Sequence, residues 1–411
     1  MTIVNCQKGL TMLTLDRVYQ AAHTLKSCVR KTDVIPYANL QSSGCELYLK
    51  AENLQLTGSF KVRGAYFKIA MLPDQEKAKG VIACSAGNHA QGVALAAQRM
   101  EIPATIFIPS VAPLSKVEAT KSYGADVRLV DGVYDDAYAA ATAYQAETGG
   151  VLIHPFDDVD VMAGQGTIGL ELLDQIPDLD AIVVPIGGGG LISGLAFVVK
   201  KLNPSCQVYG VQAAGAGSMY YSFENKKHTS LDRVATFADG IAVKCPGTAT
   251  FELCEQYVDK IVTVTDDEVA TAILTLMEQQ KLVAEGAGAV GVAAVLFDKL
   301  PLEGKKVCAV VSGGNIDVNI LSRVIRRGLL TTGRLSEVTL EMLDKPGQLR
   351  EVSSIIADAG ANVTKVLHDP SGENTDITGC YLHISMETKN KEHFCEVKRV
   401  LEAAGYRIVA G

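Results

Sequence analysis

The sequence feature that most constrains the fold is an alternation, between Gly44 and Leu330, of short apolar runs with alanine-rich stretches. The apolar runs are rich in valine and isoleucine, as at residues 105–108, 181–186 and 307–311. Such runs are typical of parallel strands buried on both faces, and helices connect parallel strands because the crossover is long. We therefore expect an α/β fold with a mainly parallel sheet.

Length and composition exclude several classes of protein. A chain of 411 residues is long enough for two or three domains. Its net charge of −8 leaves no basic surface for nucleic acid or an anionic membrane. No apolar stretch is long enough to cross a bilayer and the N-terminus has no signal-like core, so we expect a cytoplasmic protein. The ten cysteines form no C-x-x-C pair, which favours neither zinc nor disulfides.

The pattern changes after Arg334. Alternating apolar residues at 338, 340 and 342 predict a strand, a D-K-P-G turn follows, and a helical stripe ends at Gly360. Strands at 362–367, 380–386 and 406–410, with a helix around 394–401, complete the order βαββαβ. We expect residues 335–411 to form a separate ferredoxin-like domain after a larger region, 1–330.

A glycine run follows the buried strand at 181–186 and precedes a helix. Because glycines have no β-carbon, their N–H groups can surround an anion at the helix N-terminus. A tight strand–helix connection would use the same residues, so the motif alone leaves both readings open. The strict dinucleotide-binding spacing is absent. The run consists of Gly187, Gly188, Gly189, Gly190 and Leu191.

Lys61 lies at the start of a predicted helix. Ser59 is expected to cap that helix, whose apolar face carries Phe60, Phe67 and Met71. A lysine in the first turn lies near positive backbone charge, which lowers its pKa and suits a nucleophile or base. By itself the pattern fits an ordinary surface lysine better.

Five ordered motifs together resemble the fold-type II pyridoxal-phosphate (PLP) enzymes, and among them the threonine/serine dehydratases. They are S-F-K-x-R-G-A, S-A-G-N-H-A-Q-G, G-G-G-G-L, E-G-A-G-A and S-G-G-N, spread over residues 15–330. The resemblance implies two open, twisted, mainly parallel α/β sheets, with a smaller subdomain at roughly 52–160 inserted in the larger one.

The resemblance also implies residue roles. Lys61 would hold the cofactor as a Schiff base, Phe60 would pack against its ring, and Asn88 would hydrogen-bond the ring hydroxyl. The glycine run through Leu191 would bind the cofactor phosphate. The substrate carboxylate would lie on the loop formed by Ser85, Ala86, Gly87, Asn88 and His89. For His89, a purely structural place at the helix start is an equal alternative.

Ser312 corresponds to the family residue that faces the pyridine nitrogen. A hydroxyl does not keep that nitrogen protonated, so the cofactor is a weaker electron sink, which suits β-elimination. The expected reaction converts L-threonine or L-serine to 2-oxobutanoate or pyruvate and ammonia, with Lys61 removing the α-proton. Serine preference, racemisation and β-replacement remain alternatives within the enzyme class, and an amino-acid sensor that keeps the fold and the C-terminal module without turnover is the alternative outside it.

Two departures from related serine racemases narrow the choice. Those racemases carry a second serine in the loop where this chain has Ala86, so we expect poor racemisation. They also have acidic metal ligands where this chain has Gln212 and Ala213, so we expect no metal. The role of Glu285 is left open.

The C-terminal region resembles an ACT domain, which binds amino acids at subunit interfaces. The resemblance implies an amino-acid effector, isoleucine or valine, near Gly347 and Asn362, and a homo-oligomer, either dimer or tetramer. A purely assembling role is the alternative. RNA binding is disfavoured because the domain is acidic and lacks stacking aromatics. The biosynthetic or catabolic role stays open.

Overall fold

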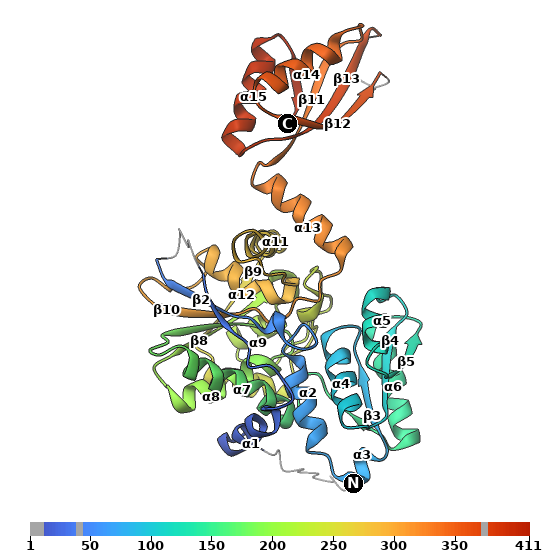
Figure 1. The fold of residues 1–411 in the computed structure, drawn as a ribbon, viewed down its shortest axis with the longest axis vertical. Coiled ribbons are helices and arrows are strands. Elements are labelled where there is room, and N and C mark those ends of the chain that lie inside the picture. Colours follow the sequence, from blue (N-terminus) through green and yellow to red (C-terminus); the bar gives the residue numbers. More distant parts are fainter. Residues whose placement is uncertain (1–11, 38–43, 371–376) are drawn as a thin grey trace. The chain divides into compact units, whose positions relative to one another are not determined.

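The computed structural model describes residues 12–37, 44–370 and 377–411. The chain forms two compact units that meet between Ile320 and Leu321, which we call the N-terminal and C-terminal units (Figure 1). The junction lies within helix α13 (Val318–Thr331), somewhat before the boundary expected from the sequence. Among the described residues, no helix is both long and apolar enough to cross a membrane.

The larger sheet of the N-terminal unit has the strand order β1-β2-β10-β7-β8-β9. All neighbouring strands are parallel except β1, which pairs with β2 in the antiparallel sense. This confirms the mainly parallel α/β class. The strands are β1 (Val34–Pro36), β2 (Glu46–Lys50), β7 (Ala181–Pro185), β8 (Gln207–Ala213), β9 (Lys260–Val264) and β10 (Lys306–Val310).

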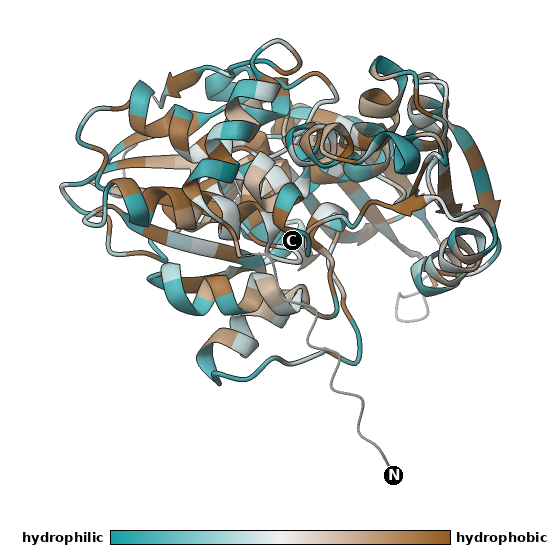
Figure 2. Ribbon diagram, turned by 90° about the horizontal axis from the view of Figure 1, so that it is seen from below, coloured by the Kyte–Doolittle hydropathy of each residue, from teal (hydrophilic) through white to brown (hydrophobic). Residues whose placement is uncertain are grey.

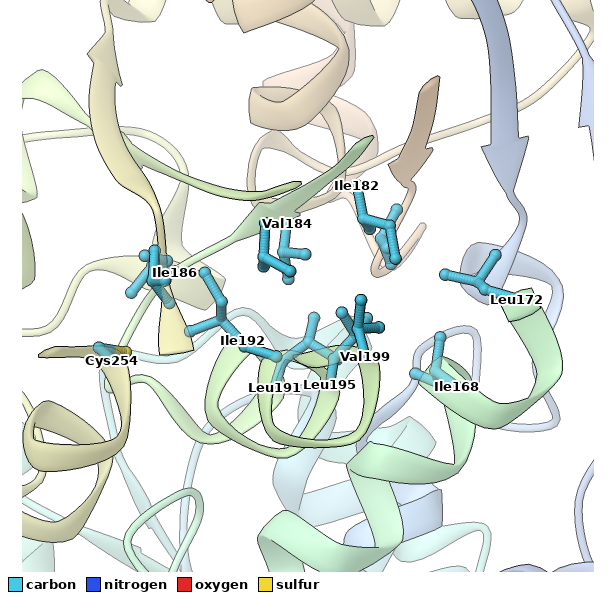
Figure 3. Close-up of a cluster of buried hydrophobic side chains, with 14 of the residues drawn as sticks. Ile168, Leu172, Ile182, Val184, Ile186, Leu191, Ile192, Leu195, Val199 and Cys254 are labelled. Carbon is cyan, nitrogen blue, oxygen red and sulfur yellow. The ribbon is translucent and has the colours of Figure 1, made fainter. Parts of the chain in front are cut away.

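Helices cover both faces of this sheet because its central strands are mostly apolar and almost fully buried. Every residue of β7 is buried, as the continuous valine and isoleucine run predicts. Ile182 and Val184 of β7 face Leu191 and Leu195 of α8 in one core cluster (Figure 3). The helices around the sheet are α1 (Leu15–Leu25), α7 (Val159–Gln175), α8 (Gly190–Leu202), α9 (Ser218–Glu224), α10 (Thr248–Tyr257), α11 (Asp266–Thr275) and α12 (Gly286–Leu296).

The smaller sheet is wholly parallel, in the order β5-β4-β3-β6. Helices α2, α4 and α5 share a core with one face, and α6 packs on the other. In Figure 2 the helices show hydrophilic colour on their outward sides, whereas the strands between them are mostly hydrophobic. The elements are α2 (Lys61–Ala70), α3 (Asp74–Lys77), β3 (Val81–Cys84), α4 (Asn88–Arg99), β4 (Ala104–Pro109), α5 (Leu114–Lys121), β5 (Asp126–Val130), α6 (Tyr134–Thr148) and β6 (Val151–Leu152).

The C-terminal unit has an antiparallel sheet with the order β12-β13-β11-β14. Val352 and Ile356 of one helix, and Val397 and Leu401 of the other, pack on one face of it. The βαββαβ order expected from the sequence is confirmed. The elements are β11 (Leu335–Leu343), α14 (Gln348–Asp358), β12 (Asn362–Asp369), β13 (Gly379–Glu387), α15 (Lys391–Ala403) and β14 (Arg407–Ala410).

A buried network of charges fixes α2 against the larger sheet. The guanidinium of Arg63 lies 2.7 Å from Glu52, which follows β2, and 2.6 Å from Glu171 on α7. Lys50, the last residue of β2, lies 2.6 Å from the same Glu171. The side chains of Arg63, Glu52 and Lys50 are 0% exposed. Two positive and two negative groups therefore balance one another, and three of the four side chains are fully buried while Glu171 is 15% exposed.

We predict that Arg63→Met destabilises the N-terminal unit strongly. Removing one partner leaves Glu52 buried without its counter-charge, which costs about 3–5 kcal/mol of unfolding free energy. Denaturant unfolding of the variant and the wild type, under the same conditions, measures the difference in unfolding free energy.

Arg128→Met is the matched control, because Arg128 forms a surface pair with Asp126. Exposed pairs contribute at most about 1 kcal/mol. Equal effects of the two arginine substitutions would show that the buried network does not stabilise the unit.

Candidate active site

The loops that follow strands β3, β7 and β10 carry Ser85–His89, the glycine run and Ser312, whereas Phe60 and Lys61 lie at the start of α2. Ser59 forms an isolated bridge with Gly313, and the backbone N–H of Phe60 donates to the Ser312 carbonyl over 3.1 Å. The start of α2, and with it Lys61, is therefore attached to the loop after β10.

Lys61 is a half-buried amine with a lowered pKa. Its Nζ donates to the carbonyl of Pro155 over 2.8 Å and lies 5.3 Å from the centre of the Phe60 ring. Burial lowers the pKa of Lys61 to about 8, opposed by the charge of Glu285. The lowered pKa was expected, but from the helix start rather than from burial.

The prediction that Ser59 caps α2 is wrong. Phe60 occupies the N-cap position without a side-chain hydrogen bond, because the chain at Ser59 is held in its bridge to Gly313. The hydroxyl of Ser59 is buried and has no hydrogen-bond partner among the described residues.

The segment 154–157 links Lys61 to the glycine loop, and sequence reasoning did not find it. Pro155 accepts the Lys61 hydrogen bond, and a β-carbon at Gly188 would lie 2.4 Å from the ring of the next residue, Phe156. A β-carbon at Gly190 would lie 2.8 Å from the backbone of the same Phe156. Asp157 then accepts from the first N–H groups of α10, at 3.0–3.2 Å. Close packing is therefore one reason for glycine at 188 and 190.

The glycine loop also presents a run of N–H groups that have no partner in the protein. The N–H of Ile186 donates to Val211, and that of Ser193 donates to Gly189 over 2.9 Å. Among the described residues, no acceptor is recorded for the N–H groups of residues 187–192, nearly all of them buried. Buried N–H groups are rarely left unpaired in folded proteins, and the N-terminus of α8 adds positive charge. This loop suits an anion such as phosphate.

Gly189 is the position where glycine is required by the backbone. Its φ is +101°, in the left-handed region, and a β-carbon there would lie 2.7 Å from the side chain of Thr250. The hydroxyl of Thr250 in turn donates to the Gly188 carbonyl over 2.6 Å. The loop is thus held in one conformation by α10.

A second set of unpaired N–H groups lies at the start of α4. Gly87 donates to the hydroxyl of Ser85 over 3.2 Å, whereas the N–H groups of Ala86, Asn88 and His89 have no recorded acceptor within the described part of the chain. The first N–H groups of a helix lack intrahelical partners and attract anions. The loop therefore suits a carboxylate.

His89 is buried and neutral. Its Nε2 donates to the Ile153 carbonyl over 2.8 Å, which fixes the tautomer because a carbonyl can only accept. Burial, with a contribution from the charge of Lys61, lowers the pKa of His89 to about 3. The side chain is not suited to acid–base chemistry near neutral pH, and the N–H of its backbone is the part available to a ligand.

Asn88, Glu285 and Asn315 form a hydrogen-bonded chain. The amide of Asn88 donates to Glu285 Oε1 over 2.6 Å, and its oxygen accepts from Asn315 over 2.7 Å. Asn315 also donates to the Thr57 carbonyl over 2.7 Å. These contacts fix the orientation of Asn88 and leave its second N–H available. The place of Glu285, which the sequence left open, is thus beside Asn88.

Glu285 is enclosed by backbone. A β-carbon at Gly313 would lie 2.4 Å from its Oε1, and one at Gly240 would lie 3.2 Å away. Burial raises the pKa of Glu285 to about 7, and the charge of Asp239 adds to the shift. Ser312, also buried, donates weakly to the Ala287 carbonyl over 3.4 Å.

The two residues expected to hold an effector lie apart within the C-terminal unit. Asn362 pairs with Glu387 at one end of the sheet, and its amide donates to that carboxylate over 2.9 Å. Gly347 follows Leu343, which pairs with Gly379 at the opposite end. One copy of the unit does not bring them together.

Comparisons with known proteins show the family of each region of the chain. A family model described as pyridoxal-phosphate dependent enzyme matches residues 25–313, and one described as ACT domain matches residues 336–390. An L-threonine ammonia-lyase of Thermotoga maritima is 50% identical over 399 residues, which are 97% of this chain and 99% of that protein.

Two solved structures are similar to the larger part of the chain. The processed form of threonine deaminase isoform 2 from Solanum lycopersicum is 36% identical, with a TM-score of 0.73, covering 77% of this chain and 90% of that one. Maize serine racemase is 37% identical, with a TM-score of 0.72, covering 76% and 97%.

The residues around Lys61 fit pyridoxal phosphate. The unpaired N–H groups of the glycine loop match its phosphate, and the Lys61 amine, held near that loop through Pro155 and Phe156, matches its aldehyde. The remaining N–H of Asn88 is available to an oxygen on the ring.

We predict that Glu285→Gln removes a pH-dependent loss of stability in the cofactor-free protein. The unfolded chain releases this proton near pH 4.5, whereas the folded protein keeps it to about pH 7. The folded state therefore holds more protons in this window, and its unfolding free energy falls as pH rises. Glutamine stays neutral, so the unfolding free energy of the variant does not fall in this way. As pH rises, the variant therefore becomes more stable relative to the wild type, by an amount on the order of 3 kcal/mol at most.

Denaturant unfolding at several pH values between 4.5 and 7.5 measures this difference. Glu118→Gln, at an exposed position, is the control. If the unfolding free energies of the wild type and Glu285→Gln changed equally with pH, Glu285 would not be a buried carboxyl group that stays protonated toward pH 7.

Proposed function

Because the chain belongs to the family of pyridoxal-phosphate dependent enzymes, we propose that it is a threonine ammonia-lyase. It eliminates water from L-threonine, or from L-serine, and water then hydrolyses the resulting imine, which releases ammonia and gives 2-oxobutanoate or pyruvate. The observation that carries the proposal is an amine of lowered pKa, Lys61, close to two loops with unpaired N–H groups. The names of the Thermotoga and tomato relatives support threonine as the substrate.

Five groups hold the cofactor in this proposal. The N–H groups of the glycine loop through Leu191 bind the phosphate, and Lys61 binds the aldehyde carbon. Phe60 packs beside the ring, Asn88 donates its free N–H to the ring hydroxyl, and Ser312 faces the ring nitrogen. Bound pyridoxal phosphate supplies the electron sink that weakens the Cα–H bond of the amino acid.

Glu285 and Asn315 position Asn88 for this contact. Each fixes one end of the amide, so the N–H that remains has a single direction. Burial raises the pKa of Glu285 to about 7, so its carboxyl group gains or loses a proton near neutral pH. The hydrogen bond from Asn88 persists in both protonation states only if the proton binds the other carboxyl oxygen and Oε1 stays an acceptor. We assign Glu285 as a positioning residue.

Lys61 acts as the base on the α-carbon. With a pKa of about 8 before cofactor binding, a substantial fraction of the amine is neutral near pH 7.5 and able to attack an aldehyde or accept a proton. The carboxylate of the substrate lies on the N–H groups of the loop Ser85–Ala86–Gly87–Asn88–His89. The β-hydroxyl would take up a proton from the cofactor phosphate or a nearby group and leave as water.

Serine racemisation is the second candidate, and the similarity to maize serine racemase favours it. Racemisation needs a second acid–base group on the face of the α-carbon opposite Lys61. In the loop at the start of α4, the related racemases have a serine where this chain has Ala86, and a methyl group cannot carry a proton. We therefore place elimination ahead of racemisation.

We predict that the wild-type protein with bound cofactor produces a 2-oxo acid from L-threonine, and that Lys61→Ala loses at least about a thousandfold of this activity. The variant has no amine to hold the cofactor or to remove the α-proton. A coupled assay for 2-oxobutanoate measures the rate, and absorbance measures bound cofactor.

Lys121→Ala is the control, because Lys121 is an exposed residue paired with Glu118. Equal turnover by Lys61→Ala would overturn the assignment. Chiral analysis of L-serine incubations separates the two candidates, since D-serine formed faster than pyruvate would favour the racemase.

We further propose that the C-terminal ACT unit binds isoleucine or valine and that the enzyme is a cytoplasmic homo-oligomer, dimer or tetramer. Gly347 and Asn362 lie at opposite ends of one sheet, so a shared effector site needs these residues from two copies. Effector binding and assembly are then linked.

We predict that isoleucine or valine shifts the threonine concentration at half-maximal rate, and that Asn362→Ala reduces this shift severalfold. The substitution removes an amide that would bind the amino-acid ligand. Saturation curves with and without each amino acid measure the shift, with Asn225→Ala as an exposed control. No response of the wild type to either amino acid would favour a purely assembling role.

A further inference from the structure

A cluster of three potential metal ligands lies in the C-terminal unit, away from the residues described above. It consists of Asp344, just after β11, His368 on β12 and Cys380 on β13. One ligand atom of each lies within 4.8 Å of the others, and His368 Nε2 is 3.2 Å from Asp344 Oδ1. Within the described residues this is the cluster that combines such donors at this spacing.

The register of the sheet explains why the three side chains converge. Cys380 pairs with the buried Met342, and His368 pairs with the buried Leu382, so both point to the helix-covered face. Asp344 lies two residues after Met342, so its side chain points to the same face of the sheet. Its N–H donates to the Thr378 carbonyl over 2.8 Å. The convergence is therefore set by strand pairing and not by a chance rotamer alone.

The donor set matches a borderline transition metal. A thiolate, an imidazole nitrogen and a carboxylate oxygen are the ligands of Zn²⁺, whereas Ca²⁺ and Mg²⁺ prefer oxygen alone. Bonds of about 2.0–2.3 Å place tetrahedral ligand atoms about 3–4 Å apart, so a small side-chain movement closes the site. Three protein ligands leave one position for water.

The burial of the three residues differs in a way that suits metal entry. Asp344 and His368 are exposed, whereas Cys380 is 2% exposed. An ion can reach the carboxylate and imidazole from solvent and then meet a thiol shielded from other reactants. An ordinary core cysteine beside a surface ion pair is the competing explanation, and it predicts no affinity for metal.

We propose that Asp344, His368 and Cys380 bind one Zn²⁺, or a similar divalent transition metal, per chain. On binding, the Cys380 thiol releases its proton to solvent and its sulfur bonds to the metal. This site was not expected from the sequence, which predicted no metal. The turn 345–347 follows Asp344 directly, so the bound metal anchors the start of α14.

Cobalt and zinc titrations of the full chain with its cofactor bound test the proposal. Co²⁺ with a thiolate ligand gives a sulfur-to-metal charge-transfer absorption, recorded as a difference spectrum against the metal-free holoenzyme. We expect one Co²⁺ per chain, displaced by Zn²⁺, with the absorption lost in Cys380→Ser. Zinc affinity, from competition with a chromophoric chelator, falls about tenfold to a hundredfold or more in His368→Ala and Asp344→Asn.

Matched substitutions control for other thiols and imidazoles. Cys395→Ser changes the exposed thiol on α15, and His383→Ala changes a histidine of β13 that bonds Thr339 and points to the opposite face. Both are expected to bind cobalt as the wild type does. Because Cys380 is buried, His368→Ala at an exposed position guards against loss of folding, which circular dichroism also monitors.

A cobalt absorption that persists in Cys380→Ser, or an equal loss in Cys395→Ser, would overturn the proposal. So would a zinc affinity unchanged by His368→Ala, or no stoichiometric binding by the wild type. None of these results depends on threonine turnover, so the metal site and the proposed activity stand or fall separately.

Discussion

The position of Lys61 depends on the buried ion pairs of Arg63. Lys61 and Arg63 share the first turn of α2, and Arg63 ties that turn to Glu52 after β2 and to Glu171 on α7. Helices α2 and α7 also approach closely, since a β-carbon at Gly64 would lie 2.7 Å from the Val161 carbonyl. A charged residue buried at such a crossing is costly unless every partner is present. The geometry of Lys61 is therefore determined by contacts with the rest of the N-terminal unit.

Burial has opposite effects on the two ionisable groups beside the site, and brings both toward neutrality. It lowers the pKa of Lys61 to about 8 and raises the pKa of Glu285 to about 7, because the charged form of each is disfavoured. The unpaired N–H groups at the starts of α4 and α8 supply positive potential without an ionisable group. Anionic ligands can thus be held in a site whose own charges are easily neutralised.

The residues proposed to bind an effector and a metal lie at both ends of the sheet of the C-terminal unit. Asn362 lies at the end marked by Glu387, whereas Gly347 and the cluster of Asp344, His368 and Cys380 lie at the end marked by Gly379. Antiparallel pairing separates them by the full length of β11 and β13. The proposed effector site would therefore need residues from two copies, whereas the proposed metal site lies within one copy.

The periodicity of apolar residues alone determined the α/β class, the βαββαβ order of the second unit and most strand positions. A strand buried on one face alternates apolar and polar residues, and a strand buried on both faces is apolar along its length, so burial can be recognised from the sequence. The motifs, through their resemblance to a family, also singled out Lys61 and the glycine loop as candidate site residues. Only the tertiary structure decided that Phe60 caps α2 in place of Ser59, that segment 154–157 joins Lys61 to that loop, and that Glu285 lies against Asn88. These features arise from contacts between residues far apart in the chain, which local patterns do not encode.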